Sequence, residues 1–448
     1  MAVDLKLPRL SPWESAPMSS PTLPGPTPLW KRELRIDWQP MVRTAREHPE
    51  AILIGLGVAL RVVTYLWNRA MWLDELSLRG NIVDKPVLDF FEPLWNDQLA
   101  PLGFLVAERV IATFVSTRNY ALRLIPLAAG IASIFLFAQL ARRVLPRRPA
   151  LVALALFALS DDLIYYSSEL KPYMIDLAIG LAITLGTVRA LGGEPTTRLL
   201  TWMAVLLAIA PWFSFASAFV VVGCGLVLVV DAALARRGRI ATLWLIVGFA
   251  WLADFAIAYR ASQALLSLYT TMYRFWDFAF LRIGVPMTTE DLSKTANLLL
   301  EVFVNPLNLL CPDGVQLGVI LPLGLFLLGI PALTRRSWRV WVLLSGPIAM
   351  AMAASAARRY PFHGRLILEL TPAFFLTIAA GTEAVARRFP GAGSLVYRTV
   401  LIVLLTFPTW DALSNCTSRR IRPFQIHGDL HETVFIDQDL RKKPGGRP

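Results

Sequence analysis

Long apolar runs dominate the pattern of hydrophobic and polar positions, and short polar segments separate them. A helix needs about 20 mainly apolar residues to cross the hydrocarbon core of a bilayer. About eleven runs, each of roughly 16 to 22 residues, meet that requirement. The pattern predicts an all-α polytopic membrane protein with transmembrane helices at 50–68, 121–141, 149–165, 173–190, 199–213, 216–235, 242–261, 315–333, 340–357, 366–386 and 397–413.

Two stretches depart from a simple span. Residues 199–235 are long enough for two short spans, with the expected break near Pro211 and Ser214. In residues 100–114 the apolar side chains recur at helical spacing, but Glu108 and Arg109 argue against a full span. We expect this second stretch to form a helix that lies in the plane of the membrane interface.

Arginines in the turns between spans predict the orientation of the chain. Counting the spans as above places four basic turns on one side, together with the N-terminus. Basic residues favour the cytoplasmic side of a membrane, so the N-terminus is expected in the cytoplasm and the C-terminal tail outside. The arginines of these turns are Arg142, Arg143, Arg147 and Arg148, then Arg236, Arg237 and Arg239, then Arg335, Arg336 and Arg339, and finally Arg387 and Arg388.

Two tails and two long outer loops complete the predicted organisation. Residues 1–45 are rich in Pro and Ser, which is typical of a disordered tail, here on the cytoplasmic side. The transmembrane domain covers residues 46–413, with outer loops at 69–120 and 262–314. Residues 414–448 form a short polar tail outside the membrane.

Composition supports this picture and narrows the chemistry. Residues are 55% hydrophobic and only 17% charged, against about 25% charged in a soluble domain. The net charge of +12 comes largely from turns that set topology, so it does not indicate nucleic-acid binding. Three cysteines and four histidines are scattered without the spacing of a disulfide framework or a metal site.

The adjacent carboxylates Asp74 and Glu75 follow the first span by a few residues. Trp72, Leu73 and Leu76 surround them with apolar groups, which favours a raised carboxylate pKa and an orientation suited to proton abstraction. The pair therefore indicates a catalytic base at the membrane surface. The alternative is that both are solvated loop carboxylates, or that one of them caps the next helix.

A second constellation lies between the third and fourth spans, in the segment from Tyr165 to Asp176. Pro172 suits the first turn of a helix, so the fourth span is expected to begin with its free backbone N–H groups facing outward. Lys171 stands beside this helix end, and together they predict an anion site. An ordinary helix entry with a snorkelling lysine is the alternative.

A third feature places arginines on the side where they are expected to be scarce. The segment from Arg358 to Arg365 contains Arg358, Arg359 and Arg365, together with His363. Arginine binds phosphate through two parallel hydrogen bonds and keeps its charge, so the cluster predicts a phosphorylated lipid ligand. Simple attraction to lipid headgroups is the alternative. We expect His363 to be a hydrogen-bonding partner rather than a metal ligand.

With these motifs in order, the sequence resembles the GT-C glycosyltransferase superfamily. It is most similar to the branch of protein O-mannosyltransferases, the aminoarabinose transferase of lipid A and related polyprenyl-phosphate-sugar transferases. The matching segments lie at 72–75, 96–104, 120–124, 166–173 and 360–366. The resemblance implies a donor sugar on a polyprenyl phosphate and an inverting transfer to a glycolipid, glycan or protein in the envelope.

The resemblance also implies roles for individual residues. Asp74 is the expected general base, with Glu75 as its helper or alternative. The leaving phosphate is expected on Lys171, Arg358, Arg359 and Arg365. Substrate-positioning roles fall to Gln98, Glu169, Tyr173 and His363. The acid and these cations should share one pocket on the non-cytoplasmic face.

The remaining expectations concern partners, location and competing functions. The resemblance implies no obligatory cofactor and no metal, and a bacterial plasma membrane as the location. A transporter or flippase of a lipid-linked sugar is the main alternative, although transporters usually bind substrate near the midplane. An inactive scaffold subunit of a transferase is a third possibility, against which the intact Asp74 and Glu75 argue.

Overall fold

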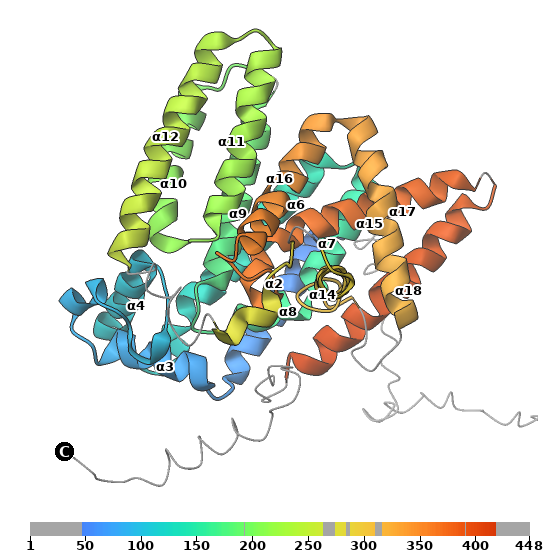
Figure 1. Cartoon of the computed structure of the whole chain (residues 1–448). Helices are drawn as coiled ribbons and strands as arrows, with labels where there is room; N and C mark the ends of the chain where they lie inside the picture. The colour runs from blue at the N-terminus through green and yellow to red at the C-terminus, as the bar shows by residue number, and fades with distance from the viewer. Residues whose placement is uncertain are drawn as a thin grey trace, which may run out of the picture. The chain divides into compact units, whose positions relative to one another are not determined.

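The computed structural model describes residues 47–191, 193–262, 274–283, 287–309, 316–389 and 391–417. Every element in these ranges is an α-helix or a short 3-10 helix. The unit that begins at His48 contains all the helices named below (Figure 1). The predicted tail at 1–45, most of the tail at 414–448 and parts of the loop at 262–314 lie outside the described residues.

Each predicted span falls on a helix. Nine of the described helices are long and apolar enough to cross a membrane, whereas α7 and α10 are shorter, with 13 and 17 residues. The helices are α2 (Pro49–Trp67), α6 (Leu124–Val144), α7 (Arg147–Leu159), α9 (Tyr173–Ala190), α10 (Thr197–Phe213), α11 (Ser217–Leu234), α12 (Gly238–Ala261), α15 (Gln316–Arg336), α16 (Trp338–Ala356), α17 (Thr371–Arg388) and α18 (Gly393–Asn415). The chain is therefore a multi-pass integral membrane protein.

Two helix boundaries refine the prediction. The predicted span at 149–165 is divided, because Ser160 adopts an extended conformation between α7 and α8 (Asp161–Tyr166). The break predicted within 199–235 is present, and it falls at Ser214, between α10 and α11. Pro211 itself lies inside α10 rather than at the break.

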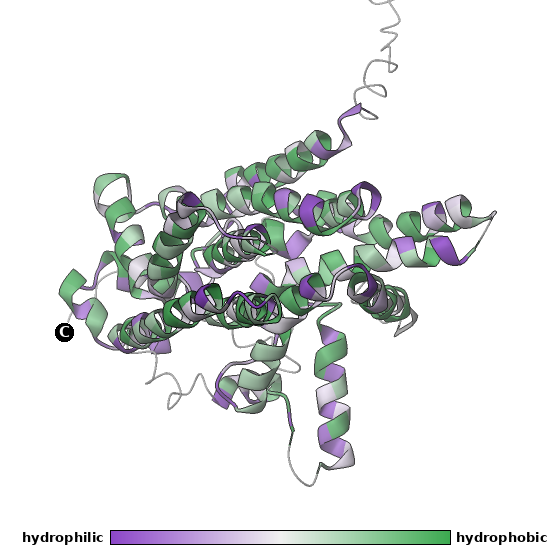
Figure 2. Cartoon of the chain, turned by 90° about the horizontal axis from the view of Figure 1, so that it is seen from above, coloured by the Kyte–Doolittle hydropathy of each residue, from purple (hydrophilic) through white to green (hydrophobic). Residues whose placement is uncertain are grey.

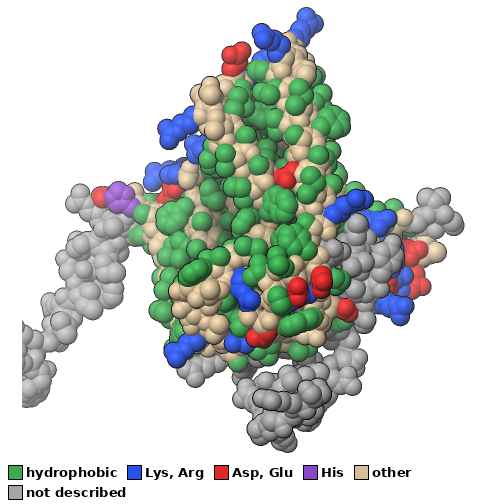
Figure 3. Space-filling view, turned by 90° about the vertical axis from the view of Figure 1, so that its left-hand side faces the viewer, with side chains coloured by type: hydrophobic (Ala, Val, Ile, Leu, Met, Phe, Trp, Pro, Cys, Tyr) green, Lys and Arg blue, Asp and Glu red, His purple; other side chains and the backbone are tan. Residues whose placement is uncertain are grey.

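Ion pairs bring the basic turns to one end of the bundle. Asp231, near the end of α11, pairs with Arg237 at 2.9 Å and with Arg339 at 2.5 Å, which joins the α11–α12 and α15–α16 turns. Both turns lie away from the end that carries α3 and α4 (Figure 1). Lys and Arg side chains also gather where α11 turns into α12 (Figure 3). Two of the four predicted basic turns therefore lie together, and the orientation of the chain in a membrane stays a prediction.

The bundle has a central helix and peripheral ones. In the apolar 18-residue stretch of the span Gly364–Arg388, which contains α17, 89% of the residues are buried. In the corresponding stretch of α12 the share is 11%. Between Leu243 and Ile257 the exposed positions of α12 are apolar, with Phe249 at 70% exposure, and the helices are hydrophobic along most of their length (Figure 2). Such a surface is costly in water but suits lipid tails.

Close backbone contact holds α15 against α17. A Cβ atom added to Gly329 would lie 1.9 Å from the carbonyl oxygen of Thr377, and one added to Gly381 would lie 1.9 Å from that of Leu325. Only glycine fits at either position. Small residues that let backbones approach in this way are a recurring means of packing helices in membranes.

Short helices of the first loop lie at the end that carries the candidate site. They are α3 (Leu73–Val83), η2 (Val87–Phe91), η3 (Trp95–Asp97), α4 (Leu102–Phe114) and α5 (Asn119–Leu122). The helix predicted at 100–114 is present as α4, and Arg109 ties it to the end of α3 by donating to the carbonyl of Ile82 at 2.6 Å. Glu108 is fully buried, and burial raises its pKa to about 9. Its position in the interface plane stays a prediction.

Candidate active site

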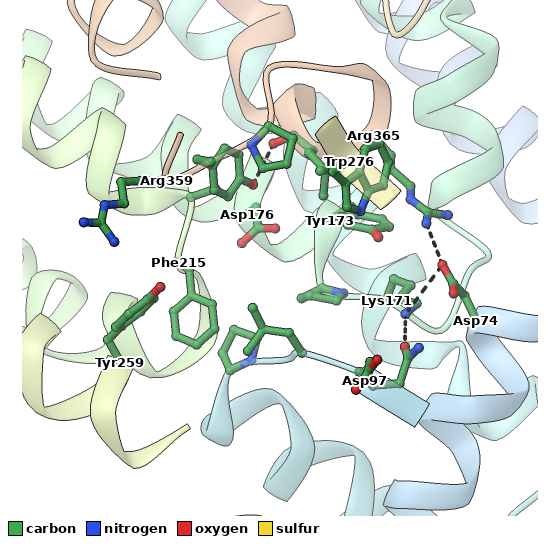
Figure 4. Close-up of a pocket in the computed structure, with 18 of the residues that line it drawn as sticks. Asp74, Asp97, Lys171, Tyr173, Asp176, Phe215, Tyr259, Trp276, Arg359 and Arg365 are labelled. Carbon is green, nitrogen blue, oxygen red and sulfur yellow. Dashed lines mark hydrogen bonds and ion pairs between the residues drawn. The ribbon is translucent and has the colours of Figure 1, made fainter. Parts of the chain in front are cut away.

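A cavity of about 210 Å³ opens between the first loop, the beginnings of α9 and α11 and the end of α12 (Figure 4). One part is lined by charged groups from α3, the α8–α9 link and the segment before α17. The other part is lined by Phe215, Tyr259 and Arg359. Six of the predicted site residues line it, namely Asp74, Gln98, Lys171, Tyr173, Arg359 and Arg365.

Asp74 meets two cations in this cavity. Arg365 Nη2 donates to Asp74 Oδ2 at 2.5 Å, and Lys171 Nζ lies 4.0 Å from the same oxygen. The three residues come from positions 74, 171 and 365, which are far apart in the sequence, and the dashed lines in Figure 4 join them. The structure thus brings together the acid and two of the predicted phosphate-binding residues.

The Lys171 side chain is buried and held in place by its neighbours. Its side chain is 6% exposed, and Nζ donates to Gln98 Oε1 at 2.6 Å. Pro172 precedes α9, which begins at Tyr173 as predicted, because proline fits where a helix starts and no backbone donor is needed. Lys171 therefore lies beside the N-terminus of α9, where the helix dipole favours an anion.

The electrostatics of Asp74 differ from the prediction. Burial opposes the charged form, but Lys171 and Arg365 outweigh it and hold the pKa of Asp74 below its ordinary value. The expectation of a raised pKa was wrong because apolar neighbours along the sequence say nothing about cations brought in by other helices. Burial likewise lowers the pKa of Lys171, against the opposing effect of Asp74.

Aromatic rings enclose the guanidinium of Arg365. Its Cζ atom lies 4.9 Å from the ring centre of Trp72, 5.6 Å from that of Tyr173 and 5.9 Å from that of Trp276. Cation–π contacts of this kind hold a cation where water is scarce. Arg365 belongs to η6 (Gly364–Leu370), which leads into α17.

Glu75 faces away from the cavity, unlike its neighbour. It is fully buried and accepts two hydrogen bonds from Arg123, at 2.9 and 2.8 Å. The backbone N–H of Leu170 donates to it at 2.9 Å, and Arg69 lies 3.9 Å away. Glu75 therefore joins the first loop to the α8–α9 link, and the predicted part in proton transfer does not suit this position.

Glu169 belongs to the same buried cluster. Arg69 Nη2 lies 3.6 Å from its carboxylate, and the side chain is 1% exposed. Burial, followed by the nearby Glu75 carboxylate, raises the pKa of Glu169 to about 7. The residue lies behind Lys171 rather than in the cavity wall, so it can position substrate only through its neighbours.

The other predicted residues of the segment from Arg358 to Arg365 lie in different places. Arg358 pairs with Asp277 and does not line the cavity, which is a correction to the predicted role in phosphate binding. Arg359 lines the cavity on the side away from Asp74 (Figure 4). His363 Nε2 lies 3.0 Å from Glu301 Oε1 at the end of α14 (Thr289–Glu301), as expected for a hydrogen-bonding partner.

Several cavity residues had no assigned role in the sequence analysis. They are Asp97, Asp176, Phe215, Tyr259 and Trp276. Asp176 follows Lys171 by five residues, and an acid inside an apolar span is itself a signal of a functional site. The others carry no such signal, because their place in the wall depends on how the helices pack. Among the described residues, no cluster of three or more His, Cys, Asp or Glu side chains suits a metal ion.

Comparisons with known proteins bear on the fold. No protein-family model and no curated protein matches the chain. The oligosaccharyltransferase of Archaeoglobus fulgidus in complex with Zn and sulfate is similar, with a TM-score of 0.51 and 12% identity over 82% of this chain and 53% of that one. ArnT from Cupriavidus metallidurans in the apo state has a TM-score of 0.50 and 13% identity over 84% of this chain and 77% of that one.

The similarity defines the class of fold. The chain shares the all-helical membrane fold of these two transferases, which is the fold that the sequence resemblance predicted. It spans about half the length of the archaeal oligosaccharyltransferase. A fold hosts more than one activity, so the activity of this chain has to be argued from its cavity.

Proposed function

We propose that the protein is an inverting glycosyltransferase that moves a sugar from a polyprenyl-phosphate donor to an acceptor. The observation that carries this proposal is the position of Asp74 opposite Lys171 and Arg365 in one cavity. An acceptor needs a carboxylate to take its proton, and a departing lipid phosphate needs cations. The GT-C architecture supports the same reading.

The chemical step balances with these groups alone. An acceptor hydroxyl or amine attacks the anomeric carbon of the donor, and the bond between that carbon and the phosphate oxygen breaks. The lipid phosphate leaves with the electron pair, and its charge is held by Lys171 and Arg365. The acceptor proton passes to Asp74, and attack opposite the leaving group inverts the anomeric carbon.

The low pKa of Asp74 describes the empty cavity, and binding of the donor changes it. In the empty cavity Lys171 and Arg365 both stabilise the Asp74 carboxylate. A bound phosphate shares these two cations and adds a negative charge beside them, which raises the basicity of Asp74. The base therefore becomes stronger when the donor is in place.

The other predicted residues take supporting parts. Gln98 and Tyr173 line the cavity and contact the sugar or the acceptor, while Arg359 supplies charge on the far wall. Glu169 holds Arg69 behind Lys171, and His363 holds the start of η6 through Glu301. We place the cavity on the non-cytoplasmic face of a bacterial plasma membrane, with an envelope glycolipid, glycan or protein as acceptor.

The test is a transfer assay with labelled polyprenyl-phosphate sugar and envelope acceptors. Asp74→Asn should lower transfer by about 10²- to 10⁴-fold, the usual contribution of a general base. Asp84→Asn is the matched control, because Asp84 is an exposed residue that follows the last turn of the same helix. Lipid translocation without sugar transfer in the unmodified protein would instead identify a transporter.

A further inference from the structure

Asp176 is a cavity carboxylate that the proposed transfer leaves unused. It lies in the first turn of α9, lines the cavity and is 8% exposed. The Ser214 side chain hydrogen-bonds to it from the break between α10 and α11. Figure 4 places Asp176 between the charged end of the cavity and Phe215.

A second buried acid lies next to Asp176. Glu369 of η6 is 6% exposed, and its Oε1 has no hydrogen-bond partner in the described part of the chain. A Cβ atom added to Gly180 would lie 3.8 Å from Glu369 Cβ, so Glu369 packs one helical turn beyond Asp176. The charge that acts on Glu369 is the carboxylate of Asp176.

No cation balances these two acids among the residues that the structure describes. Lys171 and Arg365 are engaged with Asp74, and no described arginine or lysine is among the groups that act on Asp176 or Glu369. Burying a carboxyl group without a partner is costly, and an acid kept at membrane depth is usually functional. The arrangement is one that a ligand rich in hydrogen-bond donors would complete.

We propose that Asp176, with Glu369 behind it, is the subsite that binds hydrogen-bond donors of the transferred sugar, either hydroxyl groups or a protonated amine. The inference rests on the proposed function. A phosphate held by Lys171 and Arg365 places its covalently attached sugar in the adjoining part of the cavity, where Asp176 lies. Carboxyl oxygens that are not already bonded accept hydrogen bonds from hydroxyl groups or a protonated amine, which suits a polyhydroxylated or amino sugar.

Equilibrium binding to the full-length protein in nanodiscs tests this subsite. The probes are decaprenyl phosphate, which has no sugar, and decaprenyl phosphates that carry a neutral hexose or an amino sugar. Asp176→Asn should leave decaprenyl phosphate binding unchanged and weaken the sugar-bearing lipid at least tenfold, with a smaller loss for Glu369→Gln. Lys171→Met should weaken all the lipids together, because it acts on the phosphate.

The probes also separate the sources of the donor group. A neutral hexose that gains affinity over the bare lipid in the unmodified protein, and loses it in Asp176→Asn, identifies hydroxyl groups; the same result confined to the amino sugar identifies an amine. Asp254→Asn is the matched control, since Asp254 lies within α12, accepts from Trp212 at 3.1 Å and does not line the cavity.

One result would overturn the subsite: equal affinity of Asp176→Asn and the unmodified protein for every sugar-bearing lipid, while decaprenyl phosphate still binds. A transfer rate lost at the same time would make Asp176 a catalytic residue instead. If decaprenyl phosphate fails to bind the unmodified protein, the proposed function fails first, and that outcome is distinct from the loss of the subsite.

Discussion

Asp74 and Glu75 are neighbours in the sequence but belong to two different regions of the molecule. The Asp74 side chain is 18% exposed and faces a cavity, where Arg365 and Lys171 meet it. The Glu75 side chain is fully buried against Arg123 and Arg69. Successive residues of a helix point in directions about 100° apart, so one turn of α3 serves both regions.

The difference indicates that the residues around Glu75 hold the structure together, whereas those around Asp74 are available to a ligand. The cluster around Glu75 joins the α2–α3 link, the α5–α6 link and the α8–α9 link, and its charged side chains pair with one another. The cations around Asp74 lie at the cavity wall, where a ligand can share them. Substitutions in the two regions should therefore affect different measurements.

The largest expected effect on stability follows from Glu75→Gln. This change leaves the buried Arg123 and Arg69 without their carboxylate, and breaking a buried pair in this way costs about 3–5 kcal/mol. The free energy of unfolding, measured by equilibrium denaturation in detergent micelles, should fall by that amount. Asp74→Asn, with an accessible site, should change the same quantity far less.

The matched control for this prediction is Glu383→Gln. Glu383 pairs with Arg387 one turn away, and the arginine is 71% exposed. Exposed pairs contribute at most about 1 kcal/mol. Equal losses for Glu75→Gln and Glu383→Gln would contradict the scaffold role of the buried cluster.

The next effect is on catalysis, from Lys171→Met. Removing one preorganised group that stabilises developing charge usually lowers kcat by about 10²- to 10³-fold. Lys171→Arg keeps the charge and should retain most of the activity. The transfer assay described above measures both, and a stability loss without a rate loss would place Lys171 in the scaffold instead.

The pH profile sharpens the same comparison. Asp74 acts as a base only when ionised, so kcat/KM should fall as the pH drops through its pKa, which Lys171 and Arg365 hold below the ordinary value of about 4. Without Lys171 the pKa of Asp74 rises, so the acid limb of the Lys171→Met profile should move to higher pH. An unmoved limb would show that a different group titrates.

The smallest effect is expected for Arg358→Met. Arg358 is 46% exposed, pairs with Asp277 and lies outside the cavity wall. Donor affinity should change less than twofold, whereas Arg365→Met should weaken it strongly. A large effect of Arg358→Met on binding of decaprenyl phosphate would return this residue to the phosphate site.

Hydrophobic periodicity was sufficient to predict the helices, because a bilayer requires long apolar segments whose backbone groups are satisfied internally. The start of α9 after Pro172 and the helix at 100–114 were also predictable from local signals. Motif order pointed to Asp74, Lys171 and Arg365, which the structure then placed in contact.

Side-chain direction and long-range partners were not predictable in the same way. Nothing near Glu75 in the sequence reveals Arg123, and nothing near Arg358 reveals Asp277. Asp176 was visible as an acid in an apolar span, but its place beside Glu369 depends on how η6 packs on α9. These features require the fold.

The glycine contacts between α15 and α17 bear on how the cavity admits large molecules. Because Gly329 and Gly381 bring the two backbones together, neither helix can slide along the other without a clash. The part of the cavity wall formed by η6, which carries Arg365 and leads into α17, is therefore held in place. We expect a bulky ligand to make room by displacing the end of α12, which is far less buried in the bundle than α17.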